Sequence, residues 1–482
     1  MKRIEKHSRP PWLLLGAVVP VLFAGCAVGP HYKAPAISAA PAFANSPTNS
    51  AATANDALLA TWWKGFGDPQ LDALVDQAIA QNHDLRIATA NLREARALRR
   101  LATFDLAPTV QANGSYANSL LSQAAALPGT PRDARQIEFY DAGFDATWEL
   151  DLFGRVRRSV EASNAQLGAA DANRLDVLVS VTSEVARNYF ELRGLQNRLG
   201  VARRNSDVQS ETLKITESRL EGGRGTEFDV SRSRSLLNLT LSTIPPLEGA
   251  IQKTIHRLAV LTGQQPANLN TELTAAKPLP TVSPALALGN PESVLRRRPD
   301  VRVAERSLAA ATARIGVATG DLFPRVTFVG SVGLQSSTFS GLAKGGADSW
   351  SFGPHITWAA FDLGRVYARI KASDARAEAS LAIYERTVLR ALEETENALV
   401  DLGREQSRQQ FLQSSAEASQ QAATLAKQRF EGGATDFLGV LDSERTLLEA
   451  QDRLADSQTR TATAWVAVYK ALGGGIPLTS PQ

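Results

Sequence analysis

An internal duplication constrains the fold of this chain more than any other feature of its sequence. The segment WELDLFGR at 148–155 recurs as WAAFDLGR at 358–365, a shift of 210 residues. The landmarks that keep this shift are Trp148 and Trp358, Gly154 and Gly364, Gly222 and Gly432, and Gly223 and Gly433. A repeat of this length indicates two copies of one structural unit rather than two unrelated domains.

The repeated segment marks a change of hydrophobic period. Apolar and polar residues alternate from residue 140 to 151, which is typical of a strand with one apolar and one polar face. After Gly154 apolar residues recur every three or four positions, which is typical of a helix with a coiled-coil seam. Each copy is therefore predicted to run from a strand into a very long helix.

Matching the two copies predicts how the chain is divided. The first repeat spans 68–263, with a helix, a β-hairpin at about 108–152, a long helix at 155–221, a tip at 222–227 and a return helix. The second repeat spans 299–472, with a helix, a hairpin at about 324–362, a long helix at 365–431, a tip at 432–436 and a return helix. A Pro-rich linker at 264–298 joins the copies, and residues 473–482 are predicted to be a flexible tail.

The charge and the cysteine and histidine content narrow the function classes. The formal net charge of +3 comes from the first 25 residues, so the rest of the chain is balanced and gives no electrostatic basis for binding nucleic acid. The single cysteine excludes a disulfide within the chain, and the five histidines have no metal-ligand spacing. We expect no metal and no cofactor.

The N-terminus has the pattern of a leader peptide. A basic stretch precedes an apolar run from about Trp12 to Ala24, which is too short for a spanning helix. The small residues before Cys26 resemble a bacterial lipobox, although Phe23 stands where Leu is usual. The resemblance implies that residues 1–25 are a signal peptide and that Cys26 carries a covalent lipid, palmitate included. Residues 26–67 are predicted to be an extended tether.

The strands give the predicted architecture. Four strands of roughly 10 to 14 residues are long enough to cross a bilayer at a tilt, but four strands cannot close a barrel, and open edges do not survive in lipid. Three copies would supply twelve strands and a cylinder of long antiparallel helices. We therefore expect a mainly α, α+β fold forming a homotrimeric tube, with a trimeric α-barrel and a 12-stranded transmembrane β-barrel. A soluble sandwich on a coiled coil is the alternative.

Four sets of residues then carry a family resemblance. They are CAVGPHYKAP at 26–35, TWWKGFGDPQLD at 61–72, the two strand-to-helix junctions and the two Gly-tipped turns. With them the chain resembles the TolC/OprM family of outer-membrane efflux channels, in its lipoprotein branch. The resemblance implies a trimer in the outer membrane of a Gram-negative bacterium, anchored to lipid and extending into the periplasm. It also implies a periplasmic adaptor and an inner-membrane RND-type transporter as partners.

The resemblance assigns a gate to the tips. In FEGGATDFLGVLDSER at 430–445, Leu438 would be an apolar constriction, with Asp442 and Arg445 as a polar latch. The three residues lie on one helix face, and Asp229 of the first copy matches a family residue that links neighbouring helices. In the alternative reading, Asp442 and Arg445 form an ordinary i, i+3 pair. Phe430 and Thr435 depart from the family pattern.

Local chemistry assigns roles to the junctions. Trp148 and Trp358 would lie near the periplasmic membrane interface, where amphipathic rings are favoured. The glycines at 154 and 364 would permit the bend between strand and helix, and those at 222–223 and 432–433 would end the long helices.

Two other function classes compete with a passive duct. An enzyme is disfavoured, because GLAKGG at 341–346 lacks the spacing of a phosphate loop and no Ser, His and Asp constellation stands out. The second alternative is a lipid-anchored periplasmic adaptor or scaffold with one coiled-coil hairpin. A 210-residue duplication with paired amphipathic strands favours the duct.

Overall fold

The chain forms two compact units. The sheet belongs to one of them, and the long helices α6 (Arg155–Glu221) and α11 (Leu363–Glu431) contribute residues to both. The computed structural model describes residues 27–36, 39–46, 59–280 and 288–476, so the expected signal peptide and Cys26 lie outside the described residues. Within the described ranges, one unit draws on residues 27–35, 92–170 and 303–384, and the other on residues between 36 and 91, between 171 and 302, and between 385 and 476.

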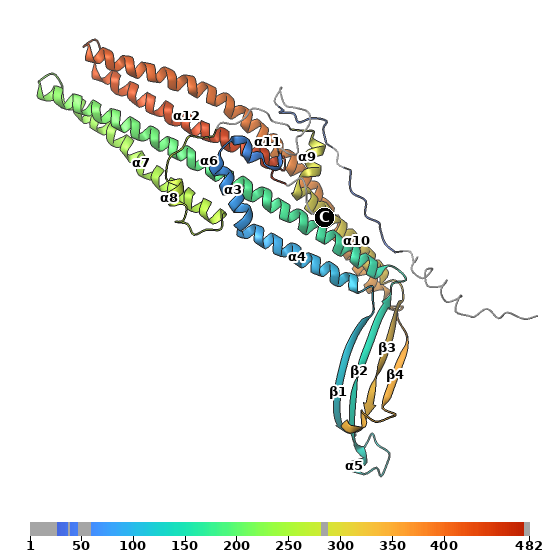
Figure 1. Cartoon of the computed structure of the whole chain (residues 1–482). Coiled ribbons are helices and arrows are strands. Elements are labelled where there is room, and N and C mark those ends of the chain that lie inside the picture. The colour runs from blue at the N-terminus through green and yellow to red at the C-terminus, as the bar shows by residue number, and fades with distance from the viewer. Residues whose placement is uncertain (1–26, 37–38, 47–58, 281–287, 477–482) are drawn as a thin grey trace, which may run out of the picture. The chain divides into compact units, whose positions relative to one another are not determined.

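The elements recur in the same order in both halves of the chain (Figure 1). The first half contains α3 (Pro69–Gln81), α4 (His83–Phe104), β1 (Thr109–Leu120), α5 (Arg132–Arg135), β2 (Gln136–Leu150), α6 (Arg155–Glu221) and α7 (Glu227–Leu261). The second half contains α10 (Pro299–Gly320), β3 (Arg325–Ser336), η2 (Phe339–Gly341), β4 (Asp348–Thr357), α11 (Leu363–Glu431) and α12 (Phe437–Ala471). The short helices α8 (Asn270–Leu273) and α9 (Pro291–Arg297) lie between them.

The four strands form one antiparallel sheet in the order β1-β2-β3-β4 (Figure 1). Its apolar face is exposed, with Phe144, Val332 and Trp350 in one register row and 57%, 59% and 70% accessible. On the opposite face the side-chain amides of Asn113 and Gln335 donate to the carboxylate of Asp141 at 2.8 and 3.0 Å. The α+β fold class is confirmed, and no second sheet covers the apolar face in the described part of the chain.

The junctions show why the chain changes from strand to helix. Asp151 accepts hydrogen bonds from the backbone N–H groups of Val156 and Arg157 at 3.0 and 2.8 Å, which satisfies two free donors at the start of α6. Gly154 has a φ of +81°, as the expected bend requires. Gly364 differs from Gly154. The helix α11 begins at Leu363, two residues before the predicted start at 365, so Gly364 lies inside the helix and has no left-handed φ.

The expected tether contains a structured segment at its end. Trp62–Phe66 forms the 3-10 helix η1, whose three aromatic rings are buried in the main hydrophobic core. Trp62 stacks on Tyr469 of α12 at 5.1 Å between centroids, and Phe66 contacts Phe190 of α6 at 4.7 Å. Because aromatic side chains bury large areas, this segment packs instead of remaining extended.

The first residues after Cys26 also dock. The buried side chain of Arg158 donates to the carbonyl oxygens of Val28 and Gly29, both at 3.1 Å. Gly29, at a φ of +86°, approaches so closely that a Cβ there would lie 2.5 Å from the Cα of Gly316. Residues 27–32 are therefore held against the first turns of α6 and against α10.

Replacing Arg158 tests this docking. Arg158→Met keeps the length of the side chain but leaves two backbone carbonyls without a donor, at about 1–3 kcal/mol each. We expect amide hydrogen exchange across residues 27–32 to accelerate at least ~10-fold. Arg314→Met, which removes an exposed arginine of α10, is the control. Equal exchange in both variants would contradict a docking role for Arg158.

Candidate functional site

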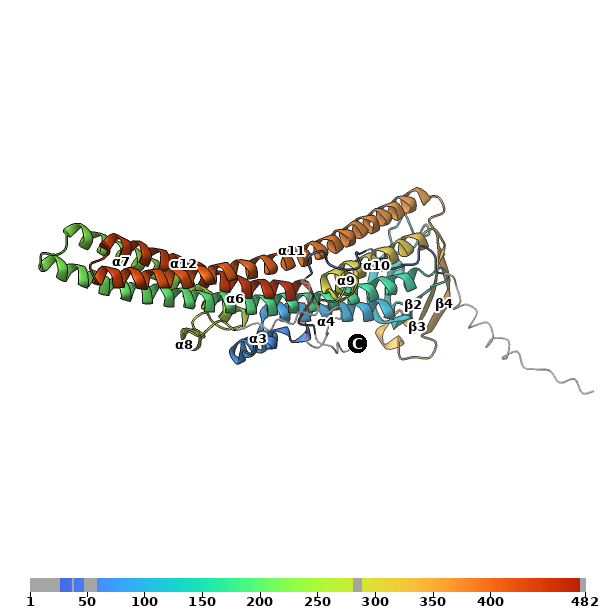
Figure 2. The same ribbon diagram turned by 90° about the horizontal axis from the view of Figure 1, so that it is seen from above.

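Two helical hairpins end in turns of the same geometry. In the α6–α7 turn, the N–H groups of Gly223 and Arg224 donate to the carbonyls of Leu220 and Arg219 at 3.0 and 2.8 Å. The α11–α12 turn repeats these bonds 210 residues later. The two hairpins are drawn in Figure 2. Gly223 and Gly433 have φ values of +69° and +72°, as this helix-ending motif requires. Gly222 and Gly432 precede them without a left-handed φ.

A side-chain cap starts each return helix. Thr226 caps α7 by accepting from the N–H of Asp229, and the Asp229 carboxylate accepts from the N–H and hydroxyl of Thr226. Asp436 caps α12 by accepting from the N–H of Gly439 at 3.2 Å. Within one copy, Asp229 therefore completes a capping box of its own helix.

The expected gate residues lie together on the exposed face of α12. Leu438 is 47% accessible, and Asp442 accepts from Arg445 at 2.9 Å in an exposed i, i+3 pair. This local pair is the contact that the alternative reading of the sequence describes. An exposed pair of this kind contributes little to stability, so both groups remain available to another partner.

Phe228 is a further exposed apolar residue at the tip that the sequence reasoning missed. It occupies in α7 the position that Leu438 occupies in α12, 210 residues later, and is 66% accessible. The guanidinium of Arg232 lies 5.1 Å from its ring centroid. The shift of 210 residues was the signal that could have identified it.

Phe430 takes part in the packing that joins the two hairpins. Its ring lies 5.1 Å from that of Phe437, and both pack with Val440 and Leu441 of α12. The guanidinium of Arg219 at the end of α6 lies 4.0 Å from the Phe430 centroid. A cation–π contact thus joins the end of α6 to the α11–α12 hairpin.

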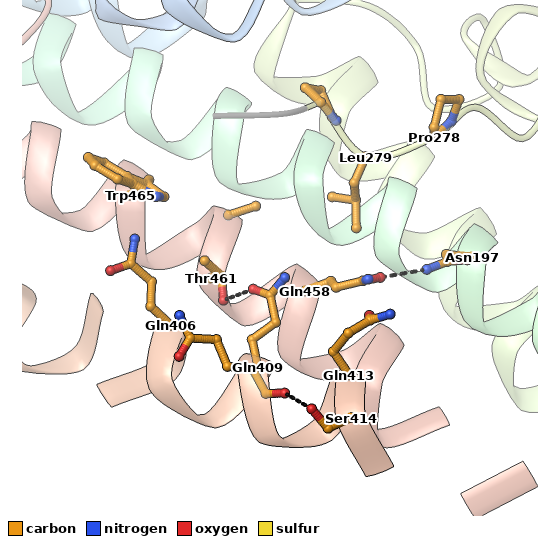
Figure 3. A pocket seen from close by; sticks show the side chains of 13 residues that line it. Asn197, Pro278, Leu279, Gln406, Gln409, Gln413, Ser414, Gln458, Thr461 and Trp465 are labelled. Atoms are coloured by element: carbon orange, nitrogen blue, oxygen red, sulfur yellow. Dashed lines mark hydrogen bonds between the residues drawn. The ribbon is translucent and has the colours of Figure 1, made fainter. Parts of the chain in front are cut away.

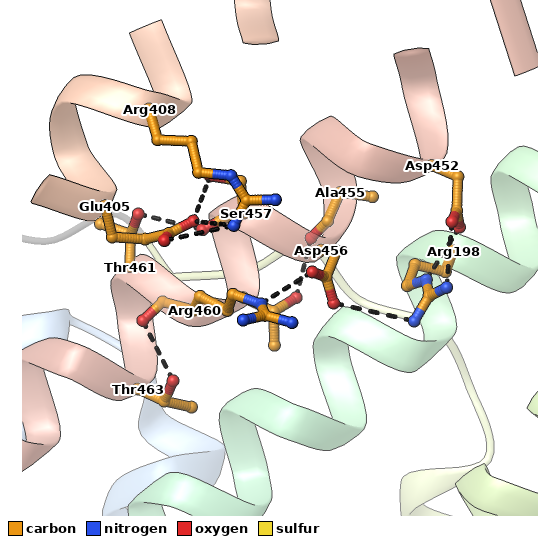
Figure 4. A network of polar contacts seen from close by, with 11 residues as sticks. Arg198, Glu405, Arg408, Asp452, Ala455, Asp456, Ser457, Arg460, Thr461 and Thr463 are labelled. Atoms are coloured by element: carbon orange, nitrogen blue, oxygen red, sulfur yellow. Dashed lines mark hydrogen bonds and ion pairs between the residues drawn. The ribbon is translucent and has the colours of Figure 1, made fainter. Parts of the chain in front are cut away.

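The exposed face of α12 carries paired charges of both signs above the tip. Arg198 of α6 binds Asp452 at 2.8 Å and reaches Asp456 at 3.8 Å, and Asp456 also accepts from Arg460 at 2.8 Å (Figure 4). Glu449 lies 3.8 Å from Arg453. Opposite charges along the face keep its net field small.

Glu444 is a buried acid between α6 and α12. One carboxylate oxygen accepts from the hydroxyl of Thr212 at 2.8 Å, and the other has no hydrogen-bond partner among the described residues. Burial raises the pKa of the Glu444 carboxyl, while Thr212 and Lys427 lower it to a smaller extent. The sequence could have indicated a buried acid, because Glu444 lies in the apolar row between Leu441 and Leu447. Nothing in the sequence indicated its hydrogen-bond partner Thr212 on α6.

A cavity of about 1040 Å³ lies between α11, α12 and the segment 278–280 (Figure 3). Amide side chains dominate its wall, and Thr461 donates to Gln409 at 2.8 Å while Asn197 donates to Gln458 at 3.3 Å. The described residues of the lining include no acid, base or cysteine. Among the described residues, no group of three or more His, Cys, Asp or Glu could hold a metal ion.

No helix within the described ranges is long and apolar enough to cross a membrane.

Comparison with known proteins covers nearly the whole chain. The model of the outer membrane efflux protein family matches residues 74–264 and 290–474. The solvent efflux pump outer membrane protein SrpC of Pseudomonas putida is 32% identical over 466 residues, which cover 94% of this chain and 96% of SrpC.

Solved structures show the same fold. The structure of the outer-membrane channel OprN is 42% identical, with a TM-score of 0.84, and the match covers 94% of this chain and all of that one. The open state of the MtrE outer membrane channel of Neisseria gonorrhoeae is 28% identical, with a TM-score of 0.83, covering 94% and 99%.

Glu444→Gln tests the buried acid. Burial raises the pKa of the Glu444 carboxyl in the folded state. The contribution of this carboxyl to stability is therefore fully present below the unfolded pKa, where the group is protonated, and is lost as pH rises through the folded pKa. At pH 7.5 the variant should slow amide exchange in the surrounding turns of α6 and α12 roughly 10-fold, about 1.4 kcal/mol. Near pH 4 parent and variant should exchange alike.

The exposed Glu449→Gln is the matched control for Glu444→Gln, and parent and variant are compared at one pH so that intrinsic exchange rates cancel. A difference of equal size at both pH values would show that Glu444 acts through packing and not through its charge.

Proposed function

This chain belongs to the outer membrane efflux protein family, and we propose that three copies of it form the passive exit duct of a three-part efflux system with a gate at the helical tips. The protein lies in the outer membrane, and its family is one of transport channels. The alternative of a periplasmic adaptor is not supported, because relatives that match over 94% of the chain are outer-membrane proteins. The observation that carries the duct is the single sheet with an exposed apolar face and two open edges.

Closure of the sheet supports the count of three. Lipid on the apolar face leaves no water to satisfy an unpaired strand edge, so β1 and β4 need partners. Two copies would give eight strands, a barrel that side chains fill, whereas three give twelve strands and leave a passage. The amide and carboxylate side chains of Asn113, Asp141 and Gln335 would then face the water-filled interior.

Threefold repetition would turn the exposed tip residues into rings. Three copies of Leu438 and of Phe228 would narrow the passage with apolar side chains. Three copies of Asp442 would form a carboxylate ring, which favours cations, and Arg445 could move between its own copy and the next. Asp229 would be available to a neighbouring helix only if its capping box opened.

The remaining assignments follow from the family and from the N-terminus. The duct would receive its substrates from an inner-membrane RND-type transporter through a periplasmic adaptor that contacts the tips. SrpC is the outer membrane protein of a solvent efflux pump, and this chain would likewise pass drugs or other small molecules that its pump delivers. A lipid on Cys26 would anchor the docked N-terminal segment to the membrane. Trp148 and Trp358, whose ring N–H groups donate to Leu106 and Leu322, would lie at the membrane interface.

Opening the tip should raise the conductance of the channel. Asp442→Ala combined with Leu438→Ala removes both the charged pair and the apolar constriction, and we expect single-channel conductance in planar bilayers to rise at least roughly twofold. Glu449→Ala is the control, because Glu449 lies on the same face of α12 but farther from the tip. Unchanged conductance in the double variant would refute the gate.

Lipidation can be measured directly. Cells labelled with radioactive palmitate should yield a labelled protein, and Cys26→Ser should lose the label while keeping the channel fold. Intact-mass measurement of the mature protein should place the cleavage site before Cys26. An unlabelled parent protein would exclude the lipid anchor, and a mass that retains residues of the leader would exclude cleavage at this site.

A further inference from the structure

The two edges of the sheet differ from its inner strands. In the described structure β1 pairs only with β2, and β4 pairs only with β3, so each outer strand presents one row of unpaired backbone groups. The proposed ring brings β4 of one copy beside β1 of the next. What ring closure alone leaves open is the register, that is, which residues face each other across this seam.

The duplication preserves register within the copy. Thr109 faces Thr147 in the first hairpin, and the residues 216 and 210 positions later, Arg325 and Thr357, face each other in the second. The same mapping holds for side chains. The ring N–H of Trp148 donates to Leu106 at 3.0 Å, and its counterpart in Trp358 donates to Leu322 at 3.0 Å.

We propose that the joint between β2 and β3 is repeated, residue by residue, between β4 of one copy and β1 of the neighbouring copy. This inference rests on the proposed ring of three copies. Residues of β4 lie 210 positions after their counterparts in β2, and residues of β1 lie 216 positions before their counterparts in β3. Gly143 faces Gly333 within the copy, so Gly353 faces Ala117 of the neighbouring copy. The further facing pairs, with the residue of the neighbouring copy second, are Trp350 and Leu120, Ser351 and Ser119, His355 and Ser115, and Thr357 and Asn113.

The chemistry of the two edges fits this register. Even-numbered positions of both strands carry the apolar face, and the register places even beside even, so Trp350 and Leu120 share the lipid side. Odd positions carry small polar residues, and Ser351 with Ser119 can hydrogen-bond across the seam. A slip by one residue would turn every apolar side chain to the polar face. The competing registers are therefore those displaced by two residues.

The helices next to the sheet support the same mapping. Within one copy the long side chain of Arg158 lies against Gly316, where an added Cβ would come within 2.8 Å of it. The corresponding residues at the seam are Ala368 and Arg100 of the neighbouring copy. At the seam the arginine is on the shorter helix α4 and the small residue is on the long helix α11, the reverse of the arrangement within the copy. One long side chain would therefore again lie against one small residue.

Two positions indicate that the seam is wider than the joint inside the copy. A Cβ on Gly333 would lie 2.7 Å from the carbonyl oxygen of Ala142, but its counterpart Ala117 has a Cβ. Gly320 lies against Arg155, but its counterpart Phe104 would lie against Arg365. The close approach of the two strands at Gly143 and Gly333 thus belongs to the interior of each copy, and the strands of the seam stand farther apart there.

Disulfide cross-linking tests the register in the full-length channel. The facing pair is Ser351→Cys with Ser119→Cys, and the offset pairs combine Ser351→Cys with Ala117→Cys or with Leu121→Cys. Facing Cβ atoms lie roughly 5 Å apart and diagonal ones about 7–8 Å, so only the facing pair suits a disulfide. A second facing pair, Phe352→Cys with Asn118→Cys, covers the lipid side.

Asp141→Cys with Gln335→Cys is the matched control, because this pair occupies the equivalent joint inside one copy. It should form a disulfide without changing the size of the chain on a non-reducing gel. The facing pairs should instead give covalent trimers, at least ~5-fold more than either offset pair.

The outcomes separate the register from the ring. If an offset pair forms trimers as efficiently as the facing pair, the register is wrong while the ring stands. If the control pair closes but neither the facing nor the offset pairs form covalent trimers, the seam itself is absent and the proposed trimeric duct fails with it.

Discussion

The need to pair every backbone group of a lipid-exposed sheet is the constraint on which the rest of this structure depends. The sheet turns its aromatic and aliphatic side chains outward, with Phe144 and Trp350 more than half exposed, and keeps amides and carboxylates on the other face. No second sheet of the described residues covers this apolar face. The sheet is completed only by further copies, and oligomerisation is therefore part of the fold.

The long helices solve a different problem, because they must hold together polar surfaces in water. Their contacts combine aromatic packing with charged pairs, as where Arg219 covers Phe430 or Arg198 joins Asp452. Buried polar groups such as Glu444 make these helix contacts less stable than an apolar seam would be. The aromatic core around η1 also holds buried donors that have no partner among the described residues, the ring N–H groups of Trp62 and Trp63.

Much of the fold could be predicted because its signals are periodic and duplicated. The start of α6 at Arg155 and the turn glycines Gly223 and Gly433 were readable, since a change of period and a left-handed helix end have local causes. Phe228 was missed although the shift of 210 residues marks it, whereas the other missed features are contacts between distant segments. The carbonyls that Arg158 binds lie about 130 residues away in sequence, and the oxygen that receives the hydroxyl of Thr212 lies 232 residues away.

The sequence by itself determined the repeat, the strand faces, the helix ends and the family, because each depends on residue order within a few turns or on a direct match of residues. Only the tertiary structure decided which residues are buried together, that Asp229 and Asp442 make local contacts in one copy, and how the strands are registered. The reason is physical: burial and strand pairing depend on distances between segments far apart in the chain, and local periodicity does not encode those distances.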